Sequence, residues 1–306
     1  MGHGEYAHRL RITKGINMLK KVGILGLAVL LASFSMVGCS QKRDEQKAAA
    51  EYITIKGSDT MVHLASAWAE SYMKAHPDAD ISVTGGGSGT GIAALLNGTT
   101  DICIASRSIK AKEVTLAKEK GLSPNEIVTS RDGIAVVVNP GNPISELTIE
   151  QIGKIYTGVY TNWKDLGGPD HEIVILSRES SSGTYVFFQE HVMKKKDYSP
   201  NAMLMPSTSA IIQSATQDMW AIGYVGLGYG VQAADRVKML NVKNNADSPA
   251  IAPSVASVQD ATYGIARPLH FYTNGAPTGT TKAFVDFVLS DAGQAIVLEA
   301  GYVPIN

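Results

Sequence analysis

Apolar residues recur with two different spacings along the chain, and the two spacings alternate from Tyr52 to the end. Stretches with apolar side chains at every second position, or in a short continuous run, predict β-strands at 53–55, 81–83, 102–104, 133–139, 172–177, 221–225, 236–241 and 263–272. Stretches with apolar positions three and four apart predict helices at 61–76, 92–96, 111–120, 148–156, 184–195, 209–219, 280–289 and 291–300. Strands that alternate with helices indicate an α/β fold.

A different pattern precedes Cys39. Two lysines, Lys20 and Lys21, are followed by a mostly apolar run at 22–37 and then by Gly38 and Cys39. A basic start, an apolar stretch and small residues predict a secretion signal, and the run of about 16 residues is shorter than the roughly 20 that a membrane-spanning helix needs. The ending also resembles the lipobox of bacterial lipoproteins, in which the cysteine is acylated and becomes the mature N-terminus.

These features predict an exported protein, held at the periplasmic or outer face of a membrane by a lipid anchor. Residues 1–38 form the signal and upstream segment in this interpretation, with residues 1–17 read as an extension before a start at Met18. Residues 39–50 are polar and lack an apolar period, so we interpret them as a lipid-anchored tether.

Composition and charge restrict the function of the body of the chain. The 306 residues are 44% hydrophobic and 18% charged, which suffices for a packed core. Outside 1–38 there are 22 Lys and Arg against 27 Asp and Glu, so this mildly acidic body gives no basic footprint for nucleic acid. Cys103 lies in an apolar strand without a second cysteine for a disulfide, and the seven histidines show no metal-ligand spacing. We therefore predict no cofactor and no metal.

Three strand-to-helix junctions share one composition of small residues and hydroxyls: 57–60, 87–90 and 180–184. Backbone N–H groups are unpaired in the first turn of a helix, and such N-termini bind oxyanions through these donors and the helix dipole. The alternative interpretation is that each junction is only an N-cap or a turn, which is the commonest use of Ser, Thr and Asp there. Because three occur in one chain, the sequence favours an oxyanion site.

Arg178 closes the strand that precedes the third junction. A guanidinium can donate to two oxygens of a tetrahedral anion at once, so we expect this side chain to face the same turn. An ion pair with Glu179 or Asp132 is the alternative.

The motifs of common enzymes are absent from the glycine-rich loop at 85–91. The chain lacks the Gly-Lys-Ser/Thr end of a nucleotide-binding loop, the G-x-G-x-x-G fingerprint and the G-x-S-x-G elbow. A secreted phosphate-ester hydrolase using Ser88 or Ser182 would lack a positioned base and a metal cluster. We therefore predict a binding protein and not an enzyme.

Several ordered motifs carry a resemblance to a known family. Gly-Ser-Asp-Thr-Met (57–61), Gly-Gly-Gly-Ser-Gly-Thr-Gly-Ile (85–92), Asp-Ile-Cys-Ile-Ala-Ser-Arg (101–107), the stretch 155–168 and Ser-Arg-Glu-Ser-Ser-Ser-Gly-Thr (177–184) resemble the phosphate-binding proteins of Pst-type ABC importers, as do 266–269 and 301–304. The resemblance implies a two-lobed periplasmic-binding-protein-like (type II) fold with a ligand cleft between the lobes. Lobe one would comprise 51–132 plus 264–306, and lobe two 133–263.

The same resemblance implies the function and the ligand contacts. The chain would capture phosphate as a monomer and pass it to the membrane subunits of an importer. The ligand-binding residues would be Ser58, Asp59, Thr60, Met61, Ser88, Arg107, Arg178, Ser182, Gly183 and Thr184.

Arg107 departs from the family, which has Asp at this position. Phosphate carries a proton at neutral pH, and Arg cannot accept it. Either Asp59 takes over as acceptor, or Arg107 pairs with an acid and leaves the site. The alternative ligands are sulfate, arsenate, molybdate or a phosphonate.

Overall fold

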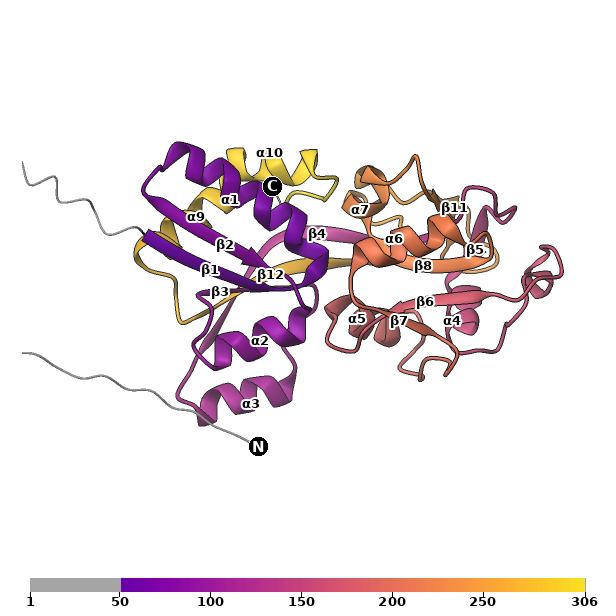
Figure 1. Cartoon of the computed structure of the whole chain (residues 1–306), viewed down its shortest axis with the longest axis horizontal. Coiled ribbons are helices and arrows are strands. Elements are labelled where there is room, and N and C mark those ends of the chain that lie inside the picture. Colours follow the sequence, from indigo (N-terminus) through magenta and orange to yellow (C-terminus); the bar gives the residue numbers. More distant parts are fainter. Residues whose placement is uncertain (1–50, 306) are drawn as a thin grey trace, which may run out of the picture. The chain divides into compact units, whose positions relative to one another are not determined.

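The computed structural model describes residues 51–305, so the predicted signal segment and the whole predicted tether, including Cys39, lie outside the described residues. Within them, helices and strands alternate as the sequence pattern predicts, and they gather into two groups, one on each side of Figure 1.

The first group contains a parallel β-sheet built from the first strands of the chain. Its elements are β1 (Glu51–Gly57), η1 (Asp59–Met61), α1 (Val62–Ala75), β2 (Ala79–Thr84), α2 (Ser88–Leu96), β3 (Ile102–Ala105) and α3 (Ala111–Glu119). Strand β1 pairs in parallel with β2 on one side and β3 on the other. Helix α1 lies above these strands in Figure 1, and α2 lies below them.

The end of the chain returns to the same group. Its elements are β12 (Ala266–Asn274), α9 (Gly279–Leu289) and α10 (Asp291–Glu299). Strand β12 runs antiparallel to β3, and Trp68 of α1 packs edge-on against Phe271 of β12 while donating to the carbonyl of Gly293 at 2.8 Å. One hydrophobic core therefore joins residues from both ends of the described chain.

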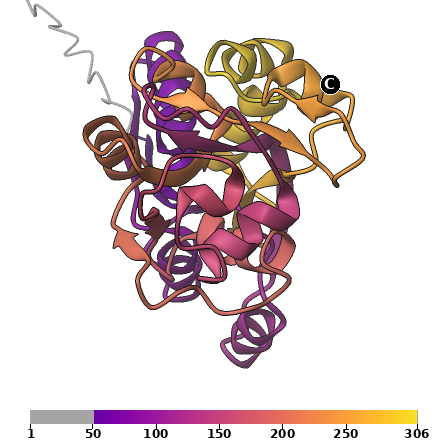
Figure 2. The same ribbon diagram turned by 90° about the vertical axis from the view of Figure 1, so that its right-hand side faces the viewer.

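The second group follows from the middle of the sequence. Its elements are β5 (Glu146–Thr148), α4 (Ile149–Tyr156), η2 (Trp163–Leu166), β6 (Val174–Arg178), α5 (Gly183–His191), β7 (Met203–Met205), α6 (Thr208–Gln217), β8 (Ala221–Gly226), α7 (Leu227–Gln232), β9 (Lys238–Met239), β10 (Asn241–Lys243), β11 (Ala250–Ile251) and α8 (Val255–Gln259). Strand β6 pairs in parallel with β7 and β8. Two further hydrophobic cores fill this group, which faces the viewer in Figure 2.

One long strand belongs to both groups. Strand β4 (Pro124–Val138) pairs antiparallel with β12 up to Gly133 and then antiparallel with β8 from Ile134 onward. The sheet order β2-β1-β3-β12-β4-β8-β6-β7 therefore runs through both groups, and Figure 1 shows β4 and β12 crossing between them. The two-lobed α/β fold is the one that the motifs imply.

Several element boundaries differ from the sequence prediction, among them the start of β4 and the end of α5. Strand β4 begins nine residues before the predicted start at 133, because its first residues are mostly polar, half-buried or exposed, and lack a continuous apolar run. Helix α5 ends at His191 and not at 195. Lys194 and Lys195 have φ angles of 52° and 65°, a left-handed conformation that a right-handed helix cannot contain.

Candidate functional site

The three junctions that the sequence singles out meet between the two lobes. Thr60 Oγ1 of the first junction lies 2.7 Å from Thr184 Oγ1 of the third. The backbone N–H of Gly89, in the second junction, donates to the carbonyl of Ser181 at 2.9 Å. Segments that are distant in the sequence thus present their hydroxyls and helix N-termini to one small volume.

A cluster of buried serine hydroxyls forms the wall contributed by the first lobe. Ser58 Oγ donates to Ser106 Oγ at 2.8 Å, and the backbone N–H of Ser106 donates to Ser88 Oγ at 3.0 Å. All three side chains are at most 1% exposed. The sequence prediction includes Ser58 and Ser88 but omits Ser106, because Ser106 follows a strand and does not begin a helix.

Gly183 allows the second lobe to close against this serine cluster. A Cβ atom at Gly183 would overlap Ser88 Oγ and would lie 2.7 Å from Ser106 Oγ, so no side chain fits there. Gly183 is the first residue of α5, and the Oγ of the preceding Ser182 accepts from the N–H groups of Thr184 and Tyr185 at 3.2 and 3.4 Å. The positive end of the α5 dipole therefore faces the hydroxyls of Ser88 and Ser106.

The other two junctions also begin helices, with different use of their N–H groups. Helix α2 starts at Ser88 after Gly87, whose φ of 98° is accessible to glycine. The N–H of Met61 is not free to bind a ligand, because it donates to the carbonyl of Ser58 at 3.0 Å. The helix α1 continues directly from η1 at Val62.

Arg178 and Asp59 form an ion pair between the two lobes. Arg178, at the end of β6, is 2% exposed, and its Nη1 donates to Thr208 Oγ1 at 2.8 Å and lies 3.4 Å from Asp59 Oδ2. Its Nη2 donates to the carbonyl of Pro206 at 3.2 Å, so each Nη retains one further hydrogen. Burial lowers the pKa of Arg178, while Asp59 opposes that shift. The ion-pair partner is thus Asp59 and neither Glu179 nor Asp132.

Asp59 is oriented by the second lobe. Its Oδ2 accepts the backbone N–H of Thr208 at 2.7 Å, and its backbone carbonyl accepts the hydroxyl of Tyr229 at 3.0 Å. Within the described residues, Oδ1 accepts no hydrogen bond, and a Cβ on Gly85 would lie 3.4 Å from it. One carboxylate oxygen therefore remains open as an acceptor.

Arg107 pairs with Glu113 of α3. Its Nη1 and Nη2 donate to the two carboxylate oxygens at 2.9 and 2.7 Å, which is a bidentate arrangement. Burial acts to raise the pKa of Glu113, but the hydrogen bonds from Arg107 and from the backbone of Lys110 together hold that pKa below its usual range. Of the two alternatives that the sequence left open for Arg107, the structure shows pairing with an acid.

A second arginine, Arg267, was not among the predicted site residues. Arg267 of β12 stands directly opposite Asp132 of β4 in the antiparallel pair, and both are fully buried. Its Nη2 donates to Asp132 Oδ2 at 3.0 Å and to Thr184 Oγ1 at 2.9 Å, and Asp132 Oδ1 accepts the N–H of Leu227. Burial raises the pKa of Asp132 and lowers that of Arg267, and the attraction between the two charges opposes both shifts.

The site carries the chemistry of an oxyanion receptor. Its groups are hydroxyls, a helix N-terminus and guanidinium groups, all of which donate hydrogen bonds. Burial raises the pKa of the Cys103 thiol, which suits a packing residue. Between residues 51 and 305 no group of three His, Cys, Asp or Glu side chains is placed to hold a metal ion, and no helix there has the length and apolar character to cross a membrane.

Comparison with known proteins finds a family model and curated relatives that agree with one another. A family model described as "PBP superfamily domain" matches residues 43–292. The phosphate-binding protein PstS of Staphylococcus epidermidis is 34% identical over 297 residues, which cover 93% of this chain and 89% of that protein. The protein of the same name from Staphylococcus aureus is 36% identical over 81% of this chain and 76% of its own length.

Solved structures show the same fold. A phosphate ABC transporter substrate-binding protein from Clostridium perfringens, with bound phosphate, matches with a TM-score of 0.76 and 32% identity over 84% of this chain and 100% of that one. An ABC-type phosphate transport receptor from Vibrio cholerae matches with a TM-score of 0.65 and 31% identity over 82% of this chain and 99% of that one.

Proposed function

This chain belongs to the PBP superfamily and, within it, to the PstS phosphate-binding proteins, and on that premise we propose that it captures inorganic phosphate outside the cytoplasm for an ABC importer. The family resemblance carried by the motifs is confirmed, and so is the two-lobed α/β fold. The observation that supports capture most directly is the close contact between Thr60 and Thr184, and between Ser88 and Gly183, each pair joining the two lobes.

The proposed ligand contacts come from both lobes. The first lobe supplies the hydroxyls of Thr60, Ser88 and Ser106, and the second supplies the hydroxyls of Ser182 and Thr184 and the N–H of Gly183. The N–H of Thr184 already donates to Ser182 Oγ and would have to exchange that partner for the ligand. Arg178 supplies a buried positive charge with two remaining Nη hydrogens. In this proposal Ser58 orients Ser106, and Met61 contributes through packing because its N–H is already used.

Asp59 is the proposed acceptor for the proton that phosphate carries at neutral pH. A fully deprotonated anion such as sulfate gains nothing from an acceptor and is repelled by its charge. The open Oδ1 supports this role, and the pairing of Arg107 with Glu113 supports leaving Arg107 out of the contact set. We therefore favour phosphate over sulfate or molybdate, which carry no proton at neutral pH, as the physiological ligand; arsenate carries a proton as phosphate does, and this acceptor does not distinguish the two.

The division into lobes follows the hydrophobic cores. We propose that residues 51–132 with 264–306 form lobe one and that 133–263 form lobe two. One core draws its residues from Ile53 to Ile104 and from Leu269 to Tyr302, whereas the largest core of the other lobe takes nearly all of its residues from Ile134 to Ile265. The strands β4 and β12 would then be the hinge.

Export, anchoring and the absence of catalysis are also proposals. A secretion signal and acylation at Cys39 would hold the binding domain, as a monomer, beside the importer. Incorporation of labelled fatty acid into the wild-type protein, and its loss in Cys39→Ala, tests the anchor. A single species at monomer mass in light scattering tests the oligomeric state, and turnover of a chromogenic phosphate ester would contradict a pure binding function.

Isothermal titration of the purified mature protein tests the central proposal. We expect one site for phosphate with micromolar or tighter affinity at neutral pH, and no displacement of phosphate by sulfate at equal concentration. Absence of heat with phosphate would overturn the function, and displacement by sulfate would favour the other oxyanions.

A further inference from the structure

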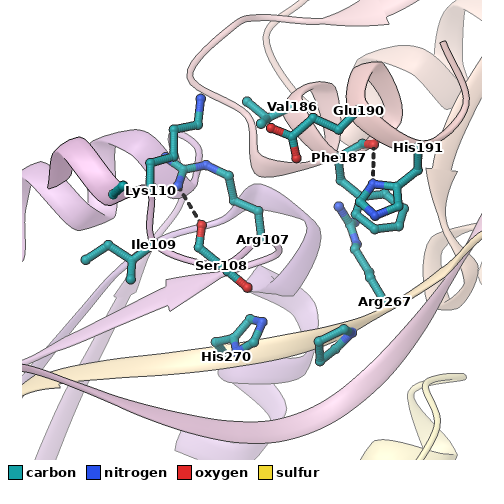
Figure 3. Close-up of a pocket in the computed structure, with 12 residues that line it drawn as sticks. Arg107, Ser108, Ile109, Lys110, Val186, Phe187, Glu190, His191, Arg267 and His270 are labelled. Carbon is teal, nitrogen blue, oxygen red and sulfur yellow. Dashed lines mark hydrogen bonds between the residues drawn. The ribbon is translucent and has the colours of Figure 1, made fainter. Parts of the chain in front are cut away.

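A cavity of about 430 Å³ lies between the lobes beside the proposed phosphate contacts (Figure 3). Phe187 and Glu190 of α5 line it on one side, Lys110 and Arg107 line it on the other, and Arg267 of β12 lies between them. This volume falls within the range of about 300–1,000 Å³ typical of small-molecule sites.

Helix α5 makes the cavity continuous with the phosphate contacts. Gly183, Phe187 and Glu190 are spaced by four and three residues, so they share one face of the helix. Gly183 packs on the serine hydroxyls, and the cavity begins one turn further along the same face. On the opposite wall, Arg107 directly follows Ser106 in the chain. A ligand in the cavity would therefore lie next to a captured phosphate.

Arg267 offers unused donors on this side. Its Nη2 is occupied by Asp132 and Thr184, but Nε and Nη1 have no hydrogen-bond partner among the described residues although both atoms are buried. The guanidinium in Figure 3 points from β12 into the region between Phe187 and Arg107. A buried N–H group without a partner is costly, so an acceptor that enters the cavity would stabilise it.

Two side chains of opposite charge, Lys110 and Glu190, line the cavity without an ion-pair partner among the described residues. Arg107 is neutralised by Glu113, whereas neither Lys110 nor Glu190 forms an ion pair within the part of the chain that the structure describes. Lys110 belongs to the first lobe and Glu190 to the second, and Figure 3 shows both at the same end of the cavity. Lys110 would attract an anion and Glu190 would weaken its binding.

We propose that this cavity is a subsite for a second phosphoryl-type anion beside the captured phosphate, held by Arg267 and Lys110. The second anion can be the other phosphoryl group of a condensed phosphate such as pyrophosphate, or a separate phosphate ion. The inference rests on the proposed function, because it assigns the first anion to the serine cluster and the N-terminus of α5.

Titration of the purified mature protein with phosphate and with pyrophosphate separates the two sources. If the subsite takes a linked group, pyrophosphate binds at one site per chain and is displaced by phosphate. If it takes a separate ion, phosphate itself shows a second, weaker site. In either case we expect Lys110→Ala to lower the affinity for pyrophosphate or for the second phosphate by about two- to fivefold, because one partly exposed charge is lost. Glu190→Gln should raise the same affinity by a similar factor.

Lys112→Ala is the matched control: Lys110 is the N-cap of α3 and Lys112 is the second residue of that helix, so the variant removes the same charge two positions away, from a residue that does not line the cavity. All three variants should keep the wild-type affinity for the first phosphate. The inference is overturned if pyrophosphate does not bind and phosphate shows one site, or if Lys110→Ala and Glu190→Gln leave the second interaction unchanged. Failure of the wild-type protein to bind phosphate at all would instead contradict the proposed function.

Discussion

The side-chain hydroxyls of Thr60 and Thr184 lie 2.7 Å apart although 124 residues separate them in the sequence. Thr60 belongs to the first lobe and Thr184 to the second. Arg267 also donates to Thr184 Oγ1, so that oxygen connects the hinge strand β12 to both lobes. The two hydroxyls that touch across the closed lobes are therefore also hydroxyls that we propose as phosphate contacts.

Thr184→Val should weaken phosphate binding by about tenfold or more. The change keeps the shape of the side chain but leaves the buried Arg267 donor without its acceptor and the Thr60 hydroxyl without its partner, a loss of about 1–3 kcal/mol. Isothermal titration measures the affinity. Thr115→Val, which removes a hydroxyl bonded only within α3, is the control and should bind as the wild type does. Equal affinity in the two variants would exclude Thr184 from the ligand set.

Gly183→Ala should reduce phosphate affinity by a larger factor, about a hundredfold, while the protein remains folded. The added methyl group would overlap Ser88 Oγ and crowd Ser106 Oγ, and overpacking of a buried contact costs about 1–3 kcal/mol or more. Separation of the lobes relieves this clash without unfolding either core. Small-angle scattering with and without phosphate should show that the variant stays open. Gly141→Ala, where the nearest atom lies 3.3 Å from the new methyl group, serves as the control.

The helix N-termini at the junctions were predictable because their signal is local. Gly, Ser and Thr at a strand-to-helix junction identify a helix N-terminus wherever the chain folds, and Ser88, Ser182 and Thr184 were found in this way. Ser106 has no such signal, since it follows β3 and precedes a loop.

The pair Arg267 and Asp132 could not be found from the sequence. The two residues are 135 positions apart, and they meet only because the register of β4 with β12 sets them opposite each other. The partners of the Arg178 side chain were likewise not predictable, because Thr208 and Asp59 come from different lobes and from distant parts of the sequence. Tertiary register, and not composition, decides these contacts.

Asp132→Asn should destabilise the protein by about 3–5 kcal/mol, because it leaves the buried Arg267 without a counter-charge. Urea unfolding monitored by circular dichroism measures the change in free energy. The double variant Asp132→Leu with Arg267→Met removes both charges and should recover most of that stability, although it also removes the donor to Thr184. If the double variant is as unstable as the single one, the cost arises from packing and not from an unpaired charge.

Asp59→Asn should lower the preference for phosphate over sulfate. An amide that presents its NH₂ group can no longer accept the proton of phosphate, and it removes the negative charge that repels sulfate. Competition titrations with the two anions measure the ratio of affinities, which we expect to fall by about tenfold for the loss of one buried acceptor. Asp80→Asn, an exposed site on β2, is the control. An unchanged ratio would require another acceptor for the proton.

Glu113→Gln should reveal a pH-dependent contribution to stability. The pKa of Glu113 is lower in the folded protein, so the folded state binds its proton less readily than the unfolded state does. The stabilisation is therefore complete above the unfolded pKa and is lost as the pH falls through the folded one. Because the Glu113 side chain is partly exposed to solvent, we expect about 0.5–1 kcal/mol at pH 7.

Urea unfolding of wild type and Glu113→Gln across pH 2–7 measures this contribution. The two proteins should differ at neutral pH and converge at the acid end, where the wild-type carboxyl is protonated as well. Glu119→Gln, an exposed position on the same helix, is the control and should follow the wild type throughout. A difference that is as large at pH 2 as at pH 7 would mean that the stabilisation does not depend on the carboxylate charge, and the ion pair with Arg107 would then contribute nothing to stability.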